Sequence, residues 1–167
     1  FAELAKSDPS PVVRLYLASA LQRMAVSDRW AILENLIAHS EDASDHNLPL
    51  MYWWAAEPAV ASDPDRAIAL AKKSGIPLVR EFIARRLCSL ATFDAKGDPT
   101  KVKIEPLNAL ATLLAETPDP TFQQDILNGM TDGLRGWVSL PTPQGWSAVY
   151  EKISASQNND LRSRVQE

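Results

Sequence analysis

The sequence predicts an all-α protein, arranged as an α-solenoid of about four to five antiparallel helix pairs. Apolar residues recur three and four positions apart along almost the whole chain, which is the spacing of one helix face. Proline begins several of these segments, where its missing N–H costs no hydrogen bond. The segments that start at Pro11, Pro49 and Pro77 are similar to one another, and a fourth copy is expected at Pro120. Stacked repeats of this kind bury one continuous core.

The first helices are predicted from caps and stripes. FAELAKSD has the pattern of the last turns of a helix, so we expect the chain to be a piece of a longer protein. Ser10 caps the next helix, and its predicted apolar stripe is Val13, Tyr16, Leu17, Ala20, Leu21 and Met24. Asp28 is expected to cap the following helix, whose stripe is Trp30, Leu33, Leu36 and Ile37.

The central helices are predicted from proline and glycine. NLPLMYWWAAEP has Asn47 as its cap and Pro49 in the first turn, and Pro58 is expected to end it. The next helix begins at Asp63 and ends at Gly75, a predicted left-handed cap. Pro77 opens a helix with the stripe Val79, Phe82, Ile83, Leu87 and Leu90.

The chain is expected to form a single helical-repeat domain over residues 1–167. The best-matched repeats occupy 1–93, a loop occupies 94–103, and further helix pairs occupy 104–167. The helix that starts near Pro120 carries Phe122, Ile126, Met130 and Leu134 four apart. Gly129, Gly133 and Gly136 lie roughly on one side of it, which favours the close approach of a neighbouring helix.

DPSPVVRLYLASAL resembles the Asp…Pro-x-Val-Arg signature of HEAT-like repeats of the bilin-lyase type. The positions that match the repeat are Asp8, Pro11, Arg14, Pro49, Pro77 and Arg80. The resemblance implies a ladder between the aspartate of the turn and the arginine of the second helix in neighbouring repeats. Tyr52 replaces the arginine in the second pair, so the ladder should be broken there.

A resemblance over nearly the whole chain is carried by HSEDASDHNLPLMYWWAAEP, IPLVREFIARRL, ILNGMTDGLRGW and LRSRVQE. These phrases resemble the helical-repeat region of large modular proteins of planctomycetes and verrucomicrobia. Such proteins join a propeller similar to sorbosone dehydrogenase, a HEAT-like region and a C-terminal cytochrome c domain. The resemblance implies an exported or periplasmic protein with haem c elsewhere in the chain. This segment has no Cys-x-x-Cys-His, so it cannot itself attach haem covalently.

The stretch from His39 to Pro58 is the strongest candidate site. His39, Asp42, Asp45 and His46 lie close together, and carboxylates and imidazoles are suitable metal ligands. The alternative is a turn between helices, in which His39 favours the negative helix end and Asp45 or Asn47 caps the next helix. The spacing matches no zinc motif, so the turn is favoured. We predict no metal, cofactor or catalytic site in this segment.

A possible interaction surface comprises Tyr52, Trp53, Trp54, Arg80, Arg85 and Arg86. Consecutive residues point about 100° apart around a helix, so the three aromatics cannot all face one core. The basic residues, with Lys72 and Lys73, could hold a phosphate, a haem propionate or an acidic partner, or form a solvated face with local ion pairs. The alternative for the aromatics is packing against Trp30. Cys88 is predicted to be a small buried hydrophobe rather than a catalytic thiol.

The charge balance bears on function. With 17 basic and 21 acidic residues the net charge is −4, which disfavours nucleic-acid binding. No apolar run approaches the roughly 18 residues of a membrane span. The sequence favours a non-catalytic scaffold that positions neighbouring domains of the same chain, or a protein partner. The family resemblance, and it alone, implies that this scaffold belongs to a larger haem- or dehydrogenase-associated protein. The alternative is a module that lines a haem or sugar pocket of an adjacent catalytic domain. A lyase or nucleic-acid-repair relative is a third, weaker candidate, since fold alone does not define function.

Overall fold

The computed structural model describes residues 1–92, 103–137 and 140–166, and in these ranges the predicted all-α class is confirmed. Ten α-helices and one short 3-10 helix make up the regular structure described, with no strand beyond one isolated bridge between Thr92 and Lys103. The loop predicted at 94–103 lies outside the described residues except for Lys103. None of the helices in these ranges is both long and apolar enough to cross a membrane.

The chain divides into two compact units, Phe1–Ile83 (unit 1) and Ala84–Glu167 (unit 2). The division falls inside α6 (Pro77–Leu90). The continuous repeat domain predicted for 1–167 stays a prediction, and each unit is described by itself.

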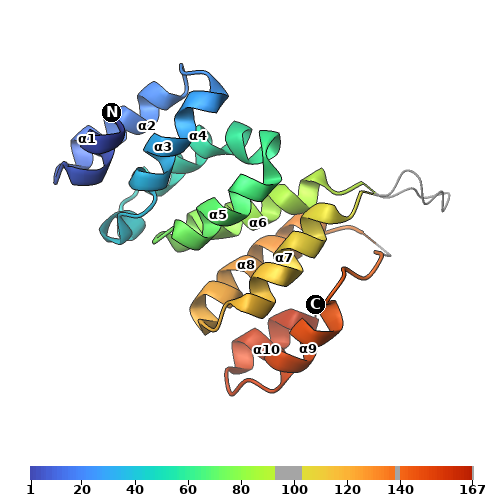
Figure 1. Cartoon of the computed structure of the whole chain (residues 1–167). Helices are drawn as coiled ribbons and strands as arrows, with labels where there is room; N and C mark the ends of the chain where they lie inside the picture. Colours follow the sequence, from blue (N-terminus) through green and yellow to red (C-terminus); the bar gives the residue numbers. More distant parts are fainter. Residues whose placement is uncertain (93–102, 138–139, 167) are drawn as a thin grey trace. The chain divides into compact units, whose positions relative to one another are not determined.

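Unit 1 contains two layers of helices. Its elements before α6 are α1 (Ala2–Ser7), α2 (Pro11–Leu21), α3 (Val26–Leu36), η1 (Ser40–Ser44), α4 (Leu48–Ser62) and α5 (Pro64–Lys73). The helix α3 packs on α1 and on α4, and α4 packs on α2, so that the α3–α4 pair covers one side of the α1–α2 pair (Figure 1). Asn35 adds a polar link, since its side-chain amide donates to the Ala2 carbonyl at 2.8 Å.

The buried side of α2 differs from the predicted stripe. Arg14, Leu17, Ala18 and Leu21 are buried, whereas Tyr16 and Ala20 are exposed. The stripe is turned because an arginine, which periodicity counts as polar, faces the interior and meets a buried carboxylate there.

Two helix starts also differ from prediction. The helix α3 begins at Val26, and Asp28 lies in its first turn instead of at the cap. A carboxylate in that position still favours the positive end of the helix. At α4, Asp45 and not Asn47 supplies the capping side chain: its Oδ1 accepts from the backbone N–H groups of Asn47 and Leu48, at 2.8 and 2.9 Å.

Pro58 does not end α4, which continues to Ser62. A proline there removes the hydrogen bond that residue 58 would donate to the Trp54 carbonyl. The helix continues because Ala59 and Val60 are fully buried in the core of unit 1. Asp63 alone then separates α4 from α5, and its carboxylate accepts from the Arg66 N–H at 3.0 Å as the cap of α5.

Gly75 is not the predicted left-handed cap, since only Gly136 and Gly145 have positive φ among the described residues. The helix α5 ends at Lys73, and the Gly75 N–H donates to the Ile37 carbonyl at 2.8 Å. A Cβ at Gly75 would lie 2.9 Å from the Ser40 Cβ. Glycine is needed there for close approach and not for its backbone angle.

Unit 2 contains the end of α6 and the helices α7 (Glu105–Glu116), α8 (Pro120–Leu134), α9 (Trp146–Ser154) and α10 (Asn159–Gln166). The helix α7 packs on α8 and α9, and α10 packs on α8 and α9 (Figure 1). The predicted stripe of α8 is confirmed for Phe122, Ile126 and Met130, which are buried. Lys152 joins α9 to the end of α7, donating to the Ala115 carbonyl at 2.6 Å.

The glycines of α8 have different roles. A Cβ at Gly133 would lie 2.7 Å from the Cys88 Cβ and 2.8 Å from the Arg85 carbonyl oxygen of α6, which confirms the expected close approach of a neighbouring helix. Gly136 lies beyond the end of α8 with φ of 92° and nothing within 4 Å of an added Cβ, so it serves the turn.

Candidate functional site

The centre of unit 1 holds a buried ion pair between Arg14 of α2 and Asp42 of η1. Arg14 Nε donates to Asp42 Oδ2 at 2.7 Å, and Arg14 Nη2 donates to Asp42 Oδ1 at 2.6 Å. The side chains are 2% and 4% exposed. Two parallel bonds between a guanidinium and a carboxylate fix orientation as well as charge. The pair therefore locks η1 against α2.

Tyr52 of α4 completes the pair. Its hydroxyl donates to Asp42 Oδ2 at 2.6 Å, and its side chain is fully buried. Tyr52 stands where the repeat has an arginine, and it still reaches the Asp42 carboxylate because a phenol is also a donor. Whether the ladder is interrupted between the second and the third helix pair stays a prediction. The carboxylate that both residues share is Asp42, whereas Asp8 contributes its backbone carbonyl, which accepts from Arg14 Nη1 at 3.1 Å.

The electrostatics of the network follow from its burial. The hydrogen bond to Asp42 raises the pKa of Arg14 above its ordinary value, and the nearby negative charge acts in the same direction. Burial raises the pKa of Tyr52 well above its ordinary value, and the hydrogen bond to Asp42 adds to the effect. Tyr52 is thus a neutral donor and Arg14 a permanent cation, and neither side chain releases its proton near neutral pH.

His39 lies at the edge of this network and ties it to α1. Its Nδ1 is 2.7 Å from Glu41 Oε1 and its Nε2 is 2.8 Å from the Ala5 carbonyl. The bond from Glu41's own backbone N–H and the bond from His39 lower the pKa of the Glu41 carboxyl. Glu41 also lies 3.7 Å from Arg14 Nη2.

The four residues of the metal hypothesis are used separately. Asp42 is held by Arg14 and Tyr52, Asp45 caps α4, His39 contacts Glu41 and Ala5, and His46 is exposed. In the part of the chain that the structure describes, no three histidine, cysteine or acidic side chains are grouped so that they could hold a metal ion. The arrangement is that of a turn between helices.

The predicted interaction surface is divided. Tyr52 and Trp53 are buried, whereas Trp54 is 55% exposed. The Trp53 ring packs on Phe82 with centroids 5.4 Å apart, and not on Trp30, whose ring lies under the Arg66 guanidinium at 4.4 Å. Of the three consecutive aromatics, only Trp54 offers its side chain to a partner.

The basic residues fall in both units. Arg80 belongs to unit 1 and is half-buried, whereas Arg85 and Arg86 belong to unit 2. Arg86 Nη1 donates to the Ser89 hydroxyl at 3.0 Å. Lys73 Nζ lies 2.5 Å from Glu34 Oε2 of α3. Joint binding by these residues remains a prediction.

Two features escaped sequence reasoning. Arg29 is buried, and its guanidinium donates to the Met24 carbonyl at the end of the first helix pair and to the Ala55 carbonyl of α4 at 3.1 Å.

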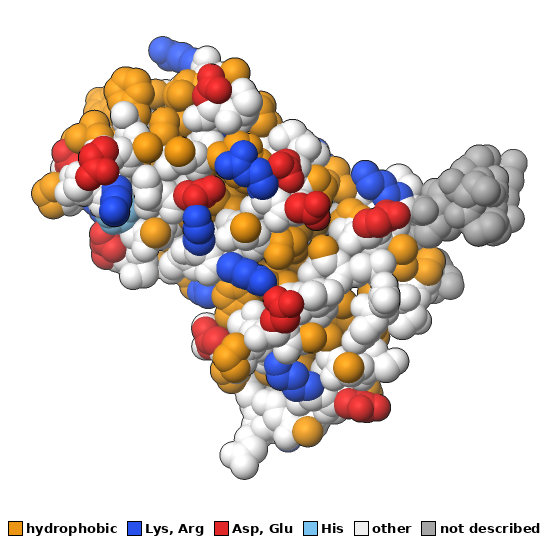
Figure 2. Space-filling view, viewed as in Figure 1, with side chains coloured by type: hydrophobic (Ala, Val, Ile, Leu, Met, Phe, Trp, Pro, Cys, Tyr) orange, Lys and Arg blue, Asp and Glu red, His pale blue; other side chains and the backbone are white. Residues whose placement is uncertain are grey.

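The second feature is an exposed apolar face on the first helix pair. Its large apolar residues exposed to solvent are Phe1, Leu4, Val12 and Tyr16. Figure 2 shows hydrophobic side chains gathered over this end of unit 1. Periodicity predicts that Tyr16 faces the core, but its side chain is 72% exposed.

Cys88 is buried, and burial raises the pKa of its thiol to about 12. A thiol of this kind is neutral and unreactive at neutral pH, as expected for a small buried hydrophobe.

Comparisons of the chain with protein-family models, with characterised proteins and with solved structures found no match. The resemblance to HEAT-like repeats therefore stays a prediction, and a functional proposal depends on the surfaces and contacts described above.

Proposed function

We propose that the chain is a non-catalytic scaffold, a HEAT-like solenoid whose helix pairs hold a neighbouring domain or a protein partner in place. The observation that carries the proposal is the exposed apolar face of the α1–α2 pair. Val12 and Tyr16 are 58% and 72% exposed, and Ala20 continues the same side of α2 one turn further on. Between Val12 and Gln22 the only charged residue is Arg14, which is buried.

The occupant that fits this face is another antiparallel helix pair with an apolar stripe. The opposite side of the α1–α2 pair is already covered in this way, by α3 on α1 and α4 on α2. A further pair would continue the stacking with the same geometry, as neighbouring repeats do in solenoids. The α2 part of this face has no exposed charge, and an uncharged surface selects an apolar and not a charged partner surface.

The buried network supports this role because it makes the face rigid. Arg14 points inward from the helix that carries Val12 and Tyr16 and is held by Asp42 and, through it, by Tyr52 of α4. A surface that is already ordered loses less conformational entropy when it binds. The haem or dehydrogenase setting of the partner comes from the family resemblance alone.

The alternative, a module that lines a haem or sugar pocket of an adjacent domain, draws on the aromatics of α4. It has less support, because Tyr52 and Trp53 are buried and Trp54 alone is accessible.

Tyrosine nitration with tetranitromethane tests the scaffold proposal, because the chain has three tyrosines in three different environments. Tyr16 is exposed, Tyr150 of unit 2 is 41% exposed, and Tyr52 is fully buried. In the isolated chain we expect Tyr16 and Tyr150 to react. Tyr52 should not react, because its raised pKa disfavours the reactive phenolate. In the protein isolated with its natural neighbours, Tyr16 alone should become as unreactive as Tyr52.

The matched variants are Tyr16→Lys and Tyr150→Lys. The first should release the neighbour in co-purification and the second should not. Equal nitration of Tyr16 in the isolated and the assembled protein would show that this face has no occupant, and the scaffold proposal would lose its support.

A further inference from the structure

Unit 2 contains a pocket with a volume of about 500 Å³ that plays no part in the proposed scaffold. Volumes of roughly 300–1,000 Å³ are typical of small-molecule sites. The pocket is lined by α7, α8 and α10 and by the segment between α8 and α9. It reaches the surface, because Trp137 in its lining is 47% exposed.

The floor of the pocket is apolar and ordered. Leu107 of α7, Leu127 and Met130 of α8, and Val165 of α10 all line it and are all buried. The helix α8 packs on both α7 and α10, and α7 and α10 both pack on α9. An apolar ligand body would complete this part of the core of unit 2.

The walls come from residues 135–137 and 140–143, together with Trp146. Gly136 and Gly145, both with positive φ, bracket the turn that leaves α8 and the turn that enters α9. Pro141 and Pro143 line the pocket between them, and proline has a fixed φ. The Gln144 N–H donates to the Asn108 side chain of α7 at 2.8 Å, which holds this wall against the floor.

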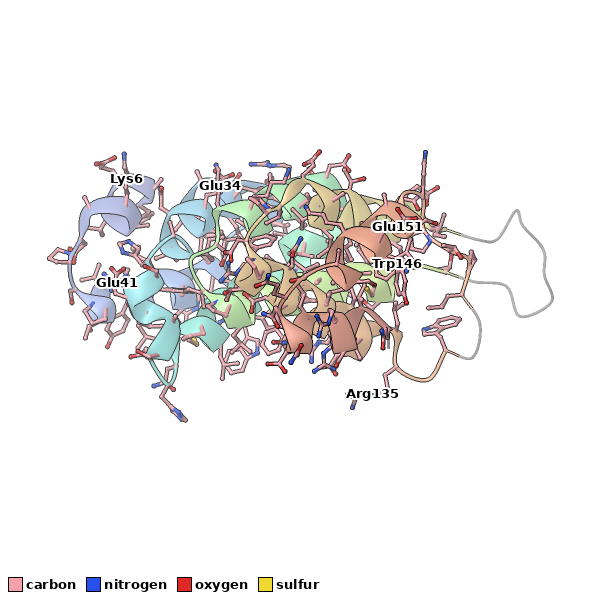
Figure 3. The ribbon with its side chains drawn as sticks, turned by 90° about the horizontal axis from the view of Figure 1, so that it is seen from below. Lys6, Glu34, Glu41, Arg135, Trp146 and Glu151 are labelled. Atoms are coloured by element: carbon pink, nitrogen blue, oxygen red, sulfur yellow. The ribbon has the colours of Figure 1, made fainter. Side chains whose placement is uncertain are left out.

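Aromatic and cationic side chains complete the lining. Trp137 and Trp146 supply flat apolar surface suited to a ring. The charged residues of the lining are Arg135 and Arg164, and no carboxylate lines the pocket among the residues described. Arg135 extends outward from the turn after α8 (Figure 3), where it pairs with Asp132 at 2.7 Å. Both partners are exposed, and such a surface pair is weak enough to exchange for a ligand.

We propose that this pocket binds an organic anion with a flat or compact apolar body, of the aryl carboxylate or aryl sulfonate class. The body would lie on the apolar floor between Trp137 and Trp146, and the anionic group would face Arg164, which Arg135 could join once it exchanges its surface pair with Asp132 for the ligand. The site is independent of the apolar face of unit 1, so either proposal can fail without the other.

Two fluorescent dyes test the proposal on the intact chain. 8-Anilinonaphthalene-1-sulfonate is an aryl sulfonate, and N-phenyl-1-naphthylamine has the same rings without the charge. Isothermal titration should give one sulfonate site per chain, with an affinity about tenfold higher than for the neutral dye, the effect of one charge-assisted contact. Arg164→Met should remove this advantage and leave the affinity for the neutral dye unchanged. Arg162→Met removes the same charge from the same helix outside the lining and should change neither affinity.

A second pair of variants tests the location. Thr131→Phe and Leu134→Trp each place a ring in the pocket, and either one should abolish binding of both dyes while circular dichroism shows a folded chain. Equal affinity for the two dyes would overturn the anion selectivity. Unchanged binding in both pocket-filling variants would place the dyes elsewhere and overturn the site, as would no binding of either dye at millimolar concentration.

Discussion

Replacement of Asp42 by asparagine should be the most damaging conservative change in unit 1. Asparagine has nearly the same size, so the packing around η1 is kept. It has no negative charge, and its NH₂ group would meet the Arg14 guanidinium where a carboxylate oxygen now accepts. Arg14, 2% exposed, would then be a buried cation without a counter-ion.

The expected cost follows from burial. An exposed ion pair contributes about 0–1 kcal/mol. Removal of one partner of a buried pair costs about 3–5 kcal/mol, because the remaining charge has been taken out of water. Since the whole free energy of unfolding of a domain is about 5–15 kcal/mol, this loss would leave unit 1 marginally stable.

The assay is urea unfolding followed by circular dichroism, together with hydrogen exchange to separate the amides of unit 1 from those of unit 2. Asp42→Asn should lower the protection of α2 and α4 and leave α8 unaffected. A double-mutant cycle with Arg14→Met isolates the pair, and Arg14→Met with Asp42→Leu should recover part of the loss, because no charge is left buried although the Tyr52 hydroxyl loses its acceptor. A cost of Asp42→Asn below about 1 kcal/mol, or equal loss of protection in both units, would refute the account of a network that holds α2 to α4.

Three further changes probe other parts of the molecule. Tyr52→Phe should cost about 1.5–3 kcal/mol in urea unfolding, because it removes a buried hydrogen bond to a charged group, and a cost near zero would mean that the hydroxyl is not bound to Asp42. Gly133→Ala should destabilise unit 2 by about 1–3 kcal/mol despite the better helix propensity of alanine, because its Cβ would lie 2.7 Å from that of Cys88; at a helical site with space around it the same change would stabilise. The Cys88 thiol, with its pKa raised from 9.0 to about 12, should resist Ellman's reagent until the chain unfolds. The pKa of this thiol is higher in the folded than in the unfolded chain, so its contribution to stability is complete below pH 9 and is lost as the pH rises towards 12. The melting temperature of unit 2 should therefore fall over this pH range. In Cys88→Ala the fall should be smaller.

The class of the fold could be read from the sequence because helix periodicity needs only local information. The stripes of α3 and α8 were predicted correctly for this reason: Trp30, Leu33 and Ile126 are apolar residues in a simple amphipathic pattern, and all are buried. The start of α5 at Asp63 and Pro64 was equally local, since a cap depends on neighbours a few positions away.

The side of α2 that faces the core could not be predicted from periodicity. Arg14 faces the core because a carboxylate 28 residues away is buried opposite it. Periodicity treats arginine as polar and turns the helix so that Tyr16 faces inward. The exposed apolar face therefore escaped sequence reasoning, although it carries the functional proposal.

The roles of Pro58 and Gly75 also depend on contacts in the folded chain that local sequence patterns do not contain. A proline was expected to end α4, but burial of the next two residues outweighs one lost hydrogen bond. A glycine after a helix suggested a left-handed cap, but Gly75 is required by the closeness of Ser40, a contact that only the folded chain makes. The pocket of unit 2 was also invisible in the sequence, since its lining is drawn from separate segments between Leu107 and Gln166.

The single residue between α4 and α5 restricts how this protein can change in length. Asp63 ends one helix and caps the next, so this one residue sets the direction in which α5 leaves α4. One inserted residue at the junction would change the position and direction of α5 and move Ala67, Leu70 and Ala71 away from their places in the core. Natural variants should accordingly keep this joint at constant length and accept insertions in longer connections, where extra residues leave the orientation of the flanking helices unchanged.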